Sequence, residues 1–428
     1  MFDLIVIGGG ISGVSAAISA ARNGANVLII EQNSFLGGSS TGALVTPMMR
    51  NMLNDNTHLT EGFFQELMGK MRETKDSAIF KDGNIGWFNP ESLKCILDDF
   101  CEEEKIEILF NTILTSVKTA NNKIQEVEVQ TDGIKQTLSA KYFIDATGNG
   151  DLAFLSGNDF ESGIDGQNQA MTLRFNLSGV NVEKFASFLE EIDPNSEISP
   201  VYRLENGEIM LSTAYTWEDK GWKLKPYFDE AIKNNDLKLE DSAYFQLFSI
   251  PNAKSSLTLN CPRISSEKPL DPLNPKDISY ALIQGRKQIR RLANFCKNYL
   301  PGFEDSFISQ IASMLGIRDS RRIKCKYQLT EEDIINAKKF KNPVFKSNYP
   351  IDVHSLKQNE DLLKFIDENH YYEFPLEAML SGQFENLIIT GRCVSATFLA
   401  QASLRIIPNC IAMGEYAGKY VALKNQSN

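Results

Sequence analysis

Glycines near the start of the chain have the spacing of a dinucleotide-binding turn. The motif Gly8-Gly-Gly10-Ile-Ser-Gly13 follows an apolar run, Leu4 to Ile7, and opens an Ala-rich helix. In such a turn the first glycine permits a tight bend, the second lets the backbone approach a pyrophosphate, and the third allows close contact between helix and strand. Glu31 ends the next apolar run, where a carboxylate accepts hydrogen bonds from ribose hydroxyls. The pattern predicts a dinucleotide whose phosphates face the helix N-terminus.

Further small residues favour FAD over NAD, although both cofactors use the same opening motif. Gly37 to Gly42 places glycines and hydroxyls just after Glu31, Ala146-Thr-Gly148 closes a later strand, and Thr390-Gly391-Arg392 closes another. Such residues are expected where the backbone runs close to a long, folded-back cofactor. The sequence has no second GxGxxG and no Cys-x-x-Cys, which counts against an NAD(P)H domain of the disulfide-reductase type without excluding transient NAD(P)H binding.

A histidine near the end of the chain is the candidate for proton transfer. His354 is one of three histidines and stands in Pro350-Ile-Asp352-Val-His354, between the middle and the last part of the chain. A proton donor or acceptor would be useful there, because an imidazole titrates near neutral pH. The alternative is that His354 and Asp352 only fix a loop that crosses between domains.

Arginines are the candidates for holding an anion. Arg318 and Arg322, with Arg321 between them, are suited to bind a substrate carboxylate bidentately or to stabilise an anionic flavin. Ion pairing at the surface or between domains is the alternative. Arg405 precedes the last helix and would either act at the same place or neutralise the cofactor's phosphates.

Composition narrows the classes of function. The 428 residues include 44 Lys and Arg against 55 Asp and Glu, a net charge of −11, which disfavours nucleic acid as the main partner. We find neither a membrane-spanning stretch nor a signal peptide, so we expect a cytoplasmic protein. Seven scattered cysteines argue against a disulfide framework, and the lack of clustered metal-ligand residues predicts no catalytic metal.

The elements that must position these residues are predicted to form an α/β fold. Leu4 to Ile7, Ile11 to Asn23 and Val27 to Ile30 read as a βαβ unit with buried parallel strands. The middle of the chain interleaves strands with longer helices, and the last part returns to a strand, Leu387 to Thr390, and a helix, Asn409 to Lys424. We therefore predict a discontinuous Rossmann-like FAD-binding domain, residues 1–159 and 350–428, with an inserted α+β substrate domain at residues 160–349.

Ordered patches over nearly the whole chain resemble the two-dinucleotide-binding-domain flavoproteins. That group includes the fumarate reductases and amine oxidases, and within it the chain is most similar to the FAD-dependent oxidoreductases. Besides the opening motif, the matching patches are Glu31 to Gly38, Phe143 to Asp151, Leu315 to Arg322, Leu329 to Asp333, Pro350 to His354 and Gly391 to Gly418. The resemblance implies a flavin domain and a β-rich substrate domain that covers the isoalloxazine ring.

The resemblance also implies roles for single residues. It places Ser12 on the pyrophosphate, Leu114 on the adenine, and Ala402 to Ile406 beneath the flavin, before a helix whose positive end stabilises the reduced ring. Cys393 lies near the predicted ring, either as a buried thiol or as a point of covalent attachment. The predicted cofactor contacts are Gly8, Gly10, Ile11, Ser12, Gly13, Glu31, Gln32, Gly37, Gly38, Ser39, Ser40, Thr41, Leu114, Ala146, Thr147, Gly148, Gly391, Arg392, Ser403, Leu404 and Ile406.

These inferences favour a dehydrogenase or reductase. In this hypothesis a small organic substrate and flavin N5 exchange a hydride, and an unidentified electron donor or acceptor completes the cycle. A flavin-dependent monooxygenase is the first alternative. A non-catalytic protein with a structural FAD is the second, because no convincing acid–base pair stands out in the sequence.

Overall fold

A five-stranded parallel sheet holds the N- and C-terminal parts of the chain together. The computed structural model describes residues 1–50, 52–53, 55–78, 86–214, 221–354, 362–367 and 369–426. The strand order is β23-β10-β1-β2-β6, with all four pairings parallel. The strands are β1 (Phe2–Ile7), β2 (Val27–Ile30), β6 (Glu107–Leu109), β10 (Ala140–Asp145) and β23 (Leu387–Ile389). The predicted α/β fold with a Rossmann-like core is confirmed.

Apolar runs form the centre of this sheet because both of its faces are covered. Every residue of β2 is buried, as are Leu4 to Ile7 of β1. A strand buried on both faces lacks the alternation of an exposed one, which is why these short runs read clearly in the sequence. The buried positions of β1 and β2 are therefore all Val, Ile or Leu.

The first and last helices of the chain lie against each other at very short range. Helix α1 (Ile11–Arg22) contacts α11 (Ile407–Gln426), and Gly414 and Gly418 of α11 stand at the crossing. A Cβ on Gly414 would lie 2.0 Å from the Ser12 carbonyl oxygen, so only glycine permits this approach. The contact fixes the N-terminus of α11 beside the glycine motif that opens α1.

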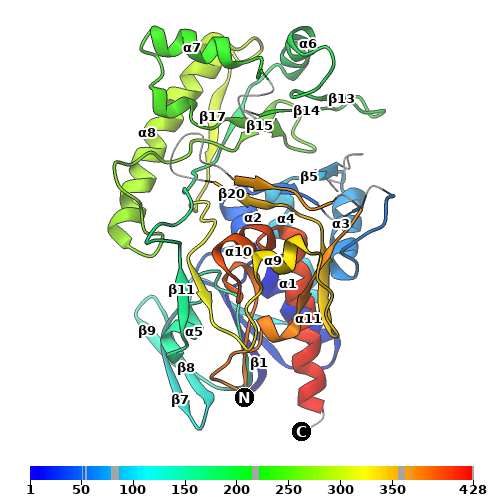
Figure 1. Ribbon diagram of the computed structural model, residues 1–428, viewed down its shortest axis with the longest axis vertical. Coiled ribbons are helices and arrows are strands. Elements are labelled where there is room, and N and C mark those ends of the chain that lie inside the picture. Colours follow the sequence, from blue (N-terminus) through cyan, green and yellow to red (C-terminus); the bar gives the residue numbers. More distant parts are fainter. Residues whose placement is uncertain are drawn as a thin grey trace.

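A second sheet is antiparallel and lies in the upper part of Figure 1 with helices α6, α7 and α8. Its strand order is β13-β14-β15-β16-β12-β17. The two larger apolar clusters of the described residues are separate: one draws on the parallel sheet and its helices, and the other on residues 171–315 together with Leu44. The predicted domain boundaries at 159/160 and 349/350 stay predictions, and Ile323, Leu329 and Ile334 pack in the first cluster.

The strands of the second sheet and the other elements have the following bounds. The other strands are β3 (Pro47–Met48), β4 (Ser77–Ala78), β5 (Gly86–Phe88), β7 (Ile113–Ala120), β8 (Lys123–Thr131), β9 (Ile134–Leu138), β11 (Phe160–Ser162), β12 (Phe175–Ser178), β13 (Val201–Arg203), β14 (Ile209–Ala214), β15 (Gln246–Ser249), β16 (Ser256–Leu259), β17 (Phe307–Ile311), β18 (Arg321–Ile323), β19 (Pro343–Ser347), β20 (Ile351–Val353), β21 (Leu362–Lys364) and β22 (Tyr372–Pro375). The other helices are α2 (Ser39–Gly42), α3 (Phe63–Glu73), α4 (Pro90–Glu103), α5 (Asp151–Ser156), α6 (Val182–Ile192), α7 (Lys225–Lys233), α8 (Pro275–Tyr299), α9 (Glu331–Ile335) and α10 (Phe398–Leu404), with 3-10 turns η2 (Leu239–Ser242), η3 (Leu376–Ala378) and η4 (Gly391–Cys393).

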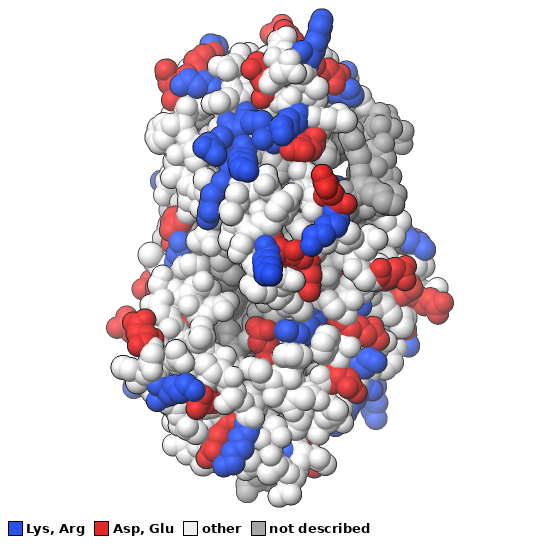
Figure 2. All heavy atoms as spheres, turned by 90° about the vertical axis from the view of Figure 1, so that its left-hand side faces the viewer, with Lys and Arg blue, Asp and Glu red and all other residues white. Residues whose placement is uncertain are grey.

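The surface on the α8 side is unevenly charged. Figure 2 shows Lys and Arg gathered in its upper part, with charges of both signs lower down and a hollow below the basic side chains. Helix α8 contributes exposed Arg286, Lys287 and Arg290 to this side of the molecule. Within the described ranges, no helix has the length and apolar character needed to cross a membrane.

Candidate active site

One cavity of about 1250 Å³ runs from the parallel sheet to the antiparallel sheet. At one end lie the carboxyl ends of β1, β2 and β10, where ligands bind in open α/β sheets. At the other end lie side chains from the antiparallel sheet and from β20. The predicted cofactor contacts that line the cavity are Gly8, Gly10, Ile11, Ser12, Glu31, Gln32, Gly37, Gly38, Ser39, Ser40, Leu114, Ala146, Thr147, Gly148, Gly391, Arg392 and Ile406.

The three glycines of the opening motif have different surroundings. Gly8 has a φ of +101°, and a Cβ there would lie 2.5 Å from the Ala146 carbonyl oxygen. A Cβ on Gly13 would lie 2.0 Å from the Gly8 carbonyl oxygen, so this residue closes the contact between helix and strand. Gly10 differs, because the nearest protein atoms to its missing side chain are 4.0 Å away. Gly8 and Gly13 therefore shape the turn, whereas Gly10 leaves open space in the cavity wall.

Glu31 is buried at the end of β2 and is held by the backbone around it. Its Oε2 accepts a hydrogen bond of 2.6 Å from the Gly9 N–H, and its Oε1 accepts one of 2.8 Å from the Asn33 N–H. The Asn33 side chain donates a further bond of 2.6 Å to Oε1. These contacts fix the carboxylate where it lines the cavity and link β2 to the glycine turn.

A buried carboxyl group shapes the turn after β10. Asp145 accepts hydrogen bonds from the Thr147 N–H and hydroxyl and from the Ala153 N–H. Burial raises the pKa of Asp145 to about 6, although these hydrogen bonds act in the opposite direction. The turn brings Gly148, with a φ of +74°, beneath the guanidinium of Arg392. Arg392 donates a bond of 2.7 Å to the Asn149 side chain.

The third glycine-containing turn follows β23. Gly391 lines the cavity beside Ser12, whose hydroxyl is 2.5 Å from the hydroxyl of Thr390. Cys393 is fully buried, does not line the cavity, and donates to the Thr390 carbonyl oxygen. Burial raises the pKa of Cys393 well above its usual value, which keeps the thiol protonated. The geometry agrees with a buried thiol.

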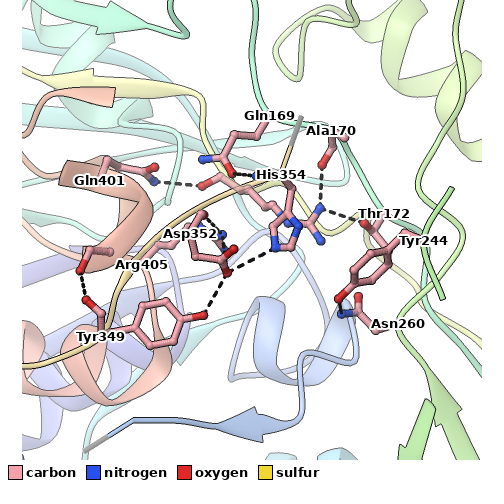
Figure 3. A network of polar contacts seen from close by, with 12 residues as sticks. Gln169, Ala170, Thr172, Tyr244, Asn260, Tyr349, Asp352, His354, Gln401 and Arg405 are labelled. Carbon is pink, nitrogen blue, oxygen red and sulfur yellow. Dashed lines mark hydrogen bonds and ion pairs between the residues drawn. The ribbon is translucent and has the colours of Figure 1, made fainter. Parts of the chain in front are cut away.

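At the other end of the cavity, strand β20 presents an acid and a histidine on one side. Residues two apart on an extended strand share a face, so Asp352 and His354 point the same way while Ile351 and Val353 pack inward. His354 Nε2 is 3.3 Å from Asp352 Oδ2. Figure 3 shows Asp352 between His354, Tyr349 and Arg405.

Asp352 is the centre of a buried polar network. The Tyr349 hydroxyl donates to its Oδ2 at 3.0 Å, and Arg405 lies 3.7 Å from the same oxygen while donating to the Asp352 carbonyl. Burial alone would raise the pKa of Asp352, but the contacts with His354, Arg405 and Tyr349 lower it well below its usual value. The group is therefore a carboxylate throughout the neutral range.

Both ring nitrogens of His354 have partners. Arg263 Nη2 lies 3.2 Å from Nδ1. A guanidinium can only donate, so Nδ1 accepts and the ring proton is on Nε2, facing Asp352. The backbone of His354 is also held, because its N–H donates to Gln169 and its carbonyl accepts from Ala170. The role of His354 as a proton donor or acceptor stays a prediction, and the contacts show that its imidazole accepts a hydrogen bond from Arg263.

Three extended segments place arginines beside this network. Thr172 pairs with both Arg263 and Gly316, and Thr172 and Arg174 share one face of their segment. Arg318 donates to the Ala170 carbonyl at 2.6 Å and to the Thr172 hydroxyl at 2.8 Å. All of these arginines line the cavity.

These arginines are buried cations. Arg174, Arg263 and Arg318 have exposed fractions of 7%, 7% and 8%. Burial lowers the pKa of Arg174 to about 10 and that of Arg318 to about 9, and the neighbouring arginines lower the Arg318 value further. Among the described residues, neither Arg174 nor Arg318 has a carboxylate within ion-pair distance.

Polar and aromatic groups complete this end of the cavity. Arg263 lies over the Tyr244 ring at 4.9 Å, and the same ring meets His354 edge-on at 5.7 Å. The Tyr244 hydroxyl is 3.3 Å from both the Gln246 side chain and the Asn260 side chain. Burial raises the pKa of Tyr244, so its phenol keeps its proton at neutral pH.

Some of the predicted residues do not line the cavity. Arg322 points to the opposite side of β18 from Arg321, because successive strand residues alternate, and it donates to the Ala396 and Gly163 carbonyls. Thr41 and Ser403 support neighbouring backbone through their hydroxyls. The predicted residues outside the lining are Gly13, Thr41, Arg322, Ser403 and Leu404, whereas His354, Arg318 and Arg405 belong to it.

Sequence reasoning missed Arg174 and Arg263. Only Arg174 had a signal, since it is the only charged residue in the apolar run Met171 to Leu177. A charge inside a buried strand is rarely tolerated without a partner, so Arg174 was open to recognition as a site residue. Arg263 was not, because its place depends on the pairing with Thr172.

Comparisons with known proteins give a family model and several distant structures. A family model described as "FAD dependent oxidoreductase" matches residues 3–428. Among solved structures, a flavoprotein/dehydrogenase from Cytophaga hutchinsonii is 10% identical, with 100% of this chain and 79% of that chain covered and a TM-score of 0.49. A geranylgeranyl bacteriochlorophyll reductase-like protein from Thermoplasma acidophilum is 12% identical, with coverages of 100% and 78% and a TM-score of 0.46. A flavin-dependent brominase is 13% identical, with coverages of 100% and 80% and a TM-score of 0.46. These distant likenesses carry no argument about the reaction.

Proposed function

Because this chain belongs to the FAD dependent oxidoreductase family, we propose that it exchanges a hydride between a small organic substrate and N5 of its FAD. One observation carries the proposal: a single cavity joins the dinucleotide turn at Gly10 to the buried polar network at Asp352. A cofactor held at the first end would reach toward the second. A substrate bound among the polar groups would then lie within the same enclosed space.

The residues at the first end fit FAD. The space in front of Gly10 is open, and a Cβ on Gly391 would meet nothing closer than Ser12 at 3.6 Å. Backbone that approaches a pyrophosphate needs such bare surfaces, and the N-terminus of α1 favours the negative charge. Gly10 and Ser12 would hold the phosphates, Glu31 the ribose and Leu114 the adenine.

The flavin supplies the redox chemistry when it is bound, as electron-pair carrier. This chain's own residues orient the substrate and handle the accompanying proton. We assign Tyr244 as the proton donor, because its phenol lines the cavity and stays protonated. Its hydroxyl is held by hydrogen bonds with the side chains of Gln246 and Asn260. Arg318 and Arg263 orient the substrate, and His354 positions Arg263.

We also propose that this chain is related to a particular group of the two-dinucleotide-binding-domain flavoproteins. The relationship is to the fumarate reductases and amine oxidases, whose resemblance implies a flavin domain, and the return of β23 and α11 to the N-terminal sheet supports such a domain. A separate electron donor or acceptor would complete the cycle. Residues 171–315 would form most of the substrate domain.

An anaerobic screen tests the proposed function. Purified protein loaded with FAD is mixed with candidate small molecules, and loss or recovery of flavin absorbance is followed. We expect a substrate that changes the flavin redox state in the wild type and does so at least tenfold more slowly in Tyr244→Phe. Incorporation of oxygen into the product would support a monooxygenase instead. A flavin that no candidate reduces or oxidises would contradict the proposal.

A further inference from the structure

The cavity has an apolar wall close to its polar end. Helix α8 and the segment before it contribute Pro272, Ile278 and Leu282 to the lining, and these three residues form the apolar wall. Resting on the function proposed above, we propose that the substrate is amphipathic. Its polar head would bind at the polar end of the cavity, beside Tyr244 and Asn260, and an alkyl or aryl segment would lie against the apolar wall.

The apolar wall follows from the spacing of residues on α8. Ile278 and Leu282 are four residues apart, so their side chains share one face of the helix. Both pack on the second apolar cluster, but protein buries them only in part, and both line the cavity. Within residues 264–299, which the structure describes in full, the lining consists of Pro272, Ile278 and Leu282. This part of the chain therefore offers the cavity apolar side chains only.

The distribution of charge on α8 favours an apolar ligand group at the wall. Charged side chains are plentiful on this helix, but Arg286, Lys287 and Arg290 are exposed and do not belong to the cavity lining. Apolar surface that faces water is unfavourable, and a ligand that covers it gains about threefold or more in affinity for each methylene group buried. The cavity face of α8 is therefore suited to a hydrocarbon segment and not to a further ionic group.

Helix α8 is held against the polar end of the cavity. Gln288 donates a hydrogen bond of 3.4 Å to the Arg263 carbonyl oxygen, and a Cβ on Gly285 would lie 2.8 Å from the Ile264 side chain. Leu282 precedes Gly285 by about one helical turn. Figure 1 shows α8 beside the antiparallel sheet and away from β1. A substrate whose head lies at the polar end therefore has the apolar wall within reach of its remaining atoms.

Two homologous series of small molecules test this inference by binding, without turnover. Straight-chain carboxylates and straight-chain primary amides of four to eight carbons are titrated into the FAD-loaded protein, and the flavin spectrum and the unfolding temperature are followed. We expect the Kd to fall about threefold or more for each added methylene group in at least one series. An affinity that does not rise with chain length in either series overturns the inference, and this comparison uses only the wild type.

A matched pair of variants on α8 locates the hydrocarbon segment. Ile278 lines the cavity, whereas Ile283 lies outside the lining with an exposed fraction of 52%. Ile278→Thr should weaken binding of the eight-carbon compound roughly fivefold or more and leave that of the four-carbon compound within about twofold. Leu282→Asn should have the same effect, and Ile283→Thr should change neither affinity. An unaltered dependence on chain length in both folded wall variants would refute the assignment.

The inference and the function on which it rests fail in different ways. If chain length has no effect while the flavin still reacts with an organic substrate, the inference fails and the function stands. If the protein binds no FAD, the proposed function fails, and the unfolding temperature of the flavin-free protein still shows whether affinity rises with chain length. A wall that covers FAD instead would raise the Kd for FAD in Ile278→Thr and leave the dependence on chain length intact, which contradicts the inference.

Discussion

The His354 imidazole accepts a hydrogen bond from Arg263, with 3.2 Å between Nδ1 and Nη2. Its other ring nitrogen faces Asp352 at 3.3 Å. We therefore propose that His354 orients Arg263, while its role in proton transfer stays a prediction. It connects β20 to an arginine of the antiparallel part of the molecule at this end of the cavity.

Replacing His354 should therefore change the affinity for the substrate and not the pH dependence of flavin reduction. We expect His354→Ala to weaken substrate binding roughly tenfold to a hundredfold, because a charge-assisted hydrogen bond of about 1.5–3 kcal/mol to Arg263 is lost. His354→Asn should restore most of the affinity, since its Oδ1 can accept from Arg263. The pH profile of flavin reduction should keep its shape in both variants. Loss of one ionisation from that profile in His354→Ala would show that the imidazole itself moves the proton.

Gly10 should matter for the cofactor and not for the fold. A Cβ at this position contacts no protein atom closer than 4.0 Å but occupies the cavity wall. We expect Gly10→Ala to leave the unfolding temperature of the flavin-free protein unchanged and to raise the Kd for FAD at least tenfold, measured by flavin fluorescence. Gly69→Ala in α3 is the matched control, where the affinity should stay the same. Equal FAD affinity in Gly10→Ala would remove this glycine from the cofactor site.

Gly414 should matter for stability. A Cβ there would lie 2.0 Å from the Ser12 carbonyl oxygen, so α1 and α11 would have to move apart. Overpacking of this kind costs about 1–3 kcal/mol or more. Gly414→Ala should lower the free energy of unfolding by at least that amount in urea denaturation. Gly382→Ala, whose nearest contact is 3.9 Å, serves as the control, and an equal loss in both variants would count against close helix contact as the cause.

Asp145 should make stability depend on pH. Burial raises its pKa from 3.8 to about 6, so the folded state favours the protonated acid. Its contribution is fully present below the unfolded pKa and is lost as the pH rises through about 6, a change of about 3 kcal/mol. Between about pH 4 and pH 7, the wild type should therefore lose about 3 kcal/mol of unfolding free energy relative to Asp145→Asn. Asp132→Asn in an exposed turn is the control. A pH-independent difference would contradict the proposed protonation of Asp145.

The parts of the fold with buried parallel strands were predictable from the sequence. Leu4 to Ile7 and the following glycine motif encode a strand, a turn and a helix within a few residues, and the structure extends the strand only to Phe2. Local signals of this kind need no knowledge of the rest of the chain. The end of the chain was predictable for the same reason, since α11 extends the predicted helix by two residues at each end.

The substrate end was harder to predict because it forms between distant segments. Thr172 pairs with Arg263 and Gly316, and these segments are far apart in the sequence. The direction of Arg322 depends on which face of β18 is turned to the cavity, which the adjacent Arg321 and Arg322 do not reveal. His354 and Arg405 were recognised from the sequence. Their partners were not, because Arg263 contacts His354 and Asp352 contacts Arg405 from distant parts of the chain.

The most direct measurement of the central claim is the anaerobic reaction of the FAD-loaded protein with small organic compounds. We predict that a substrate changes the flavin redox state at a rate that saturates with its concentration. Arg318→Gln should lower the apparent affinity for that substrate at least tenfold, because Arg318 orients it. The account is contradicted if no compound changes the flavin redox state, or if product forms solely with oxygen incorporated from the air.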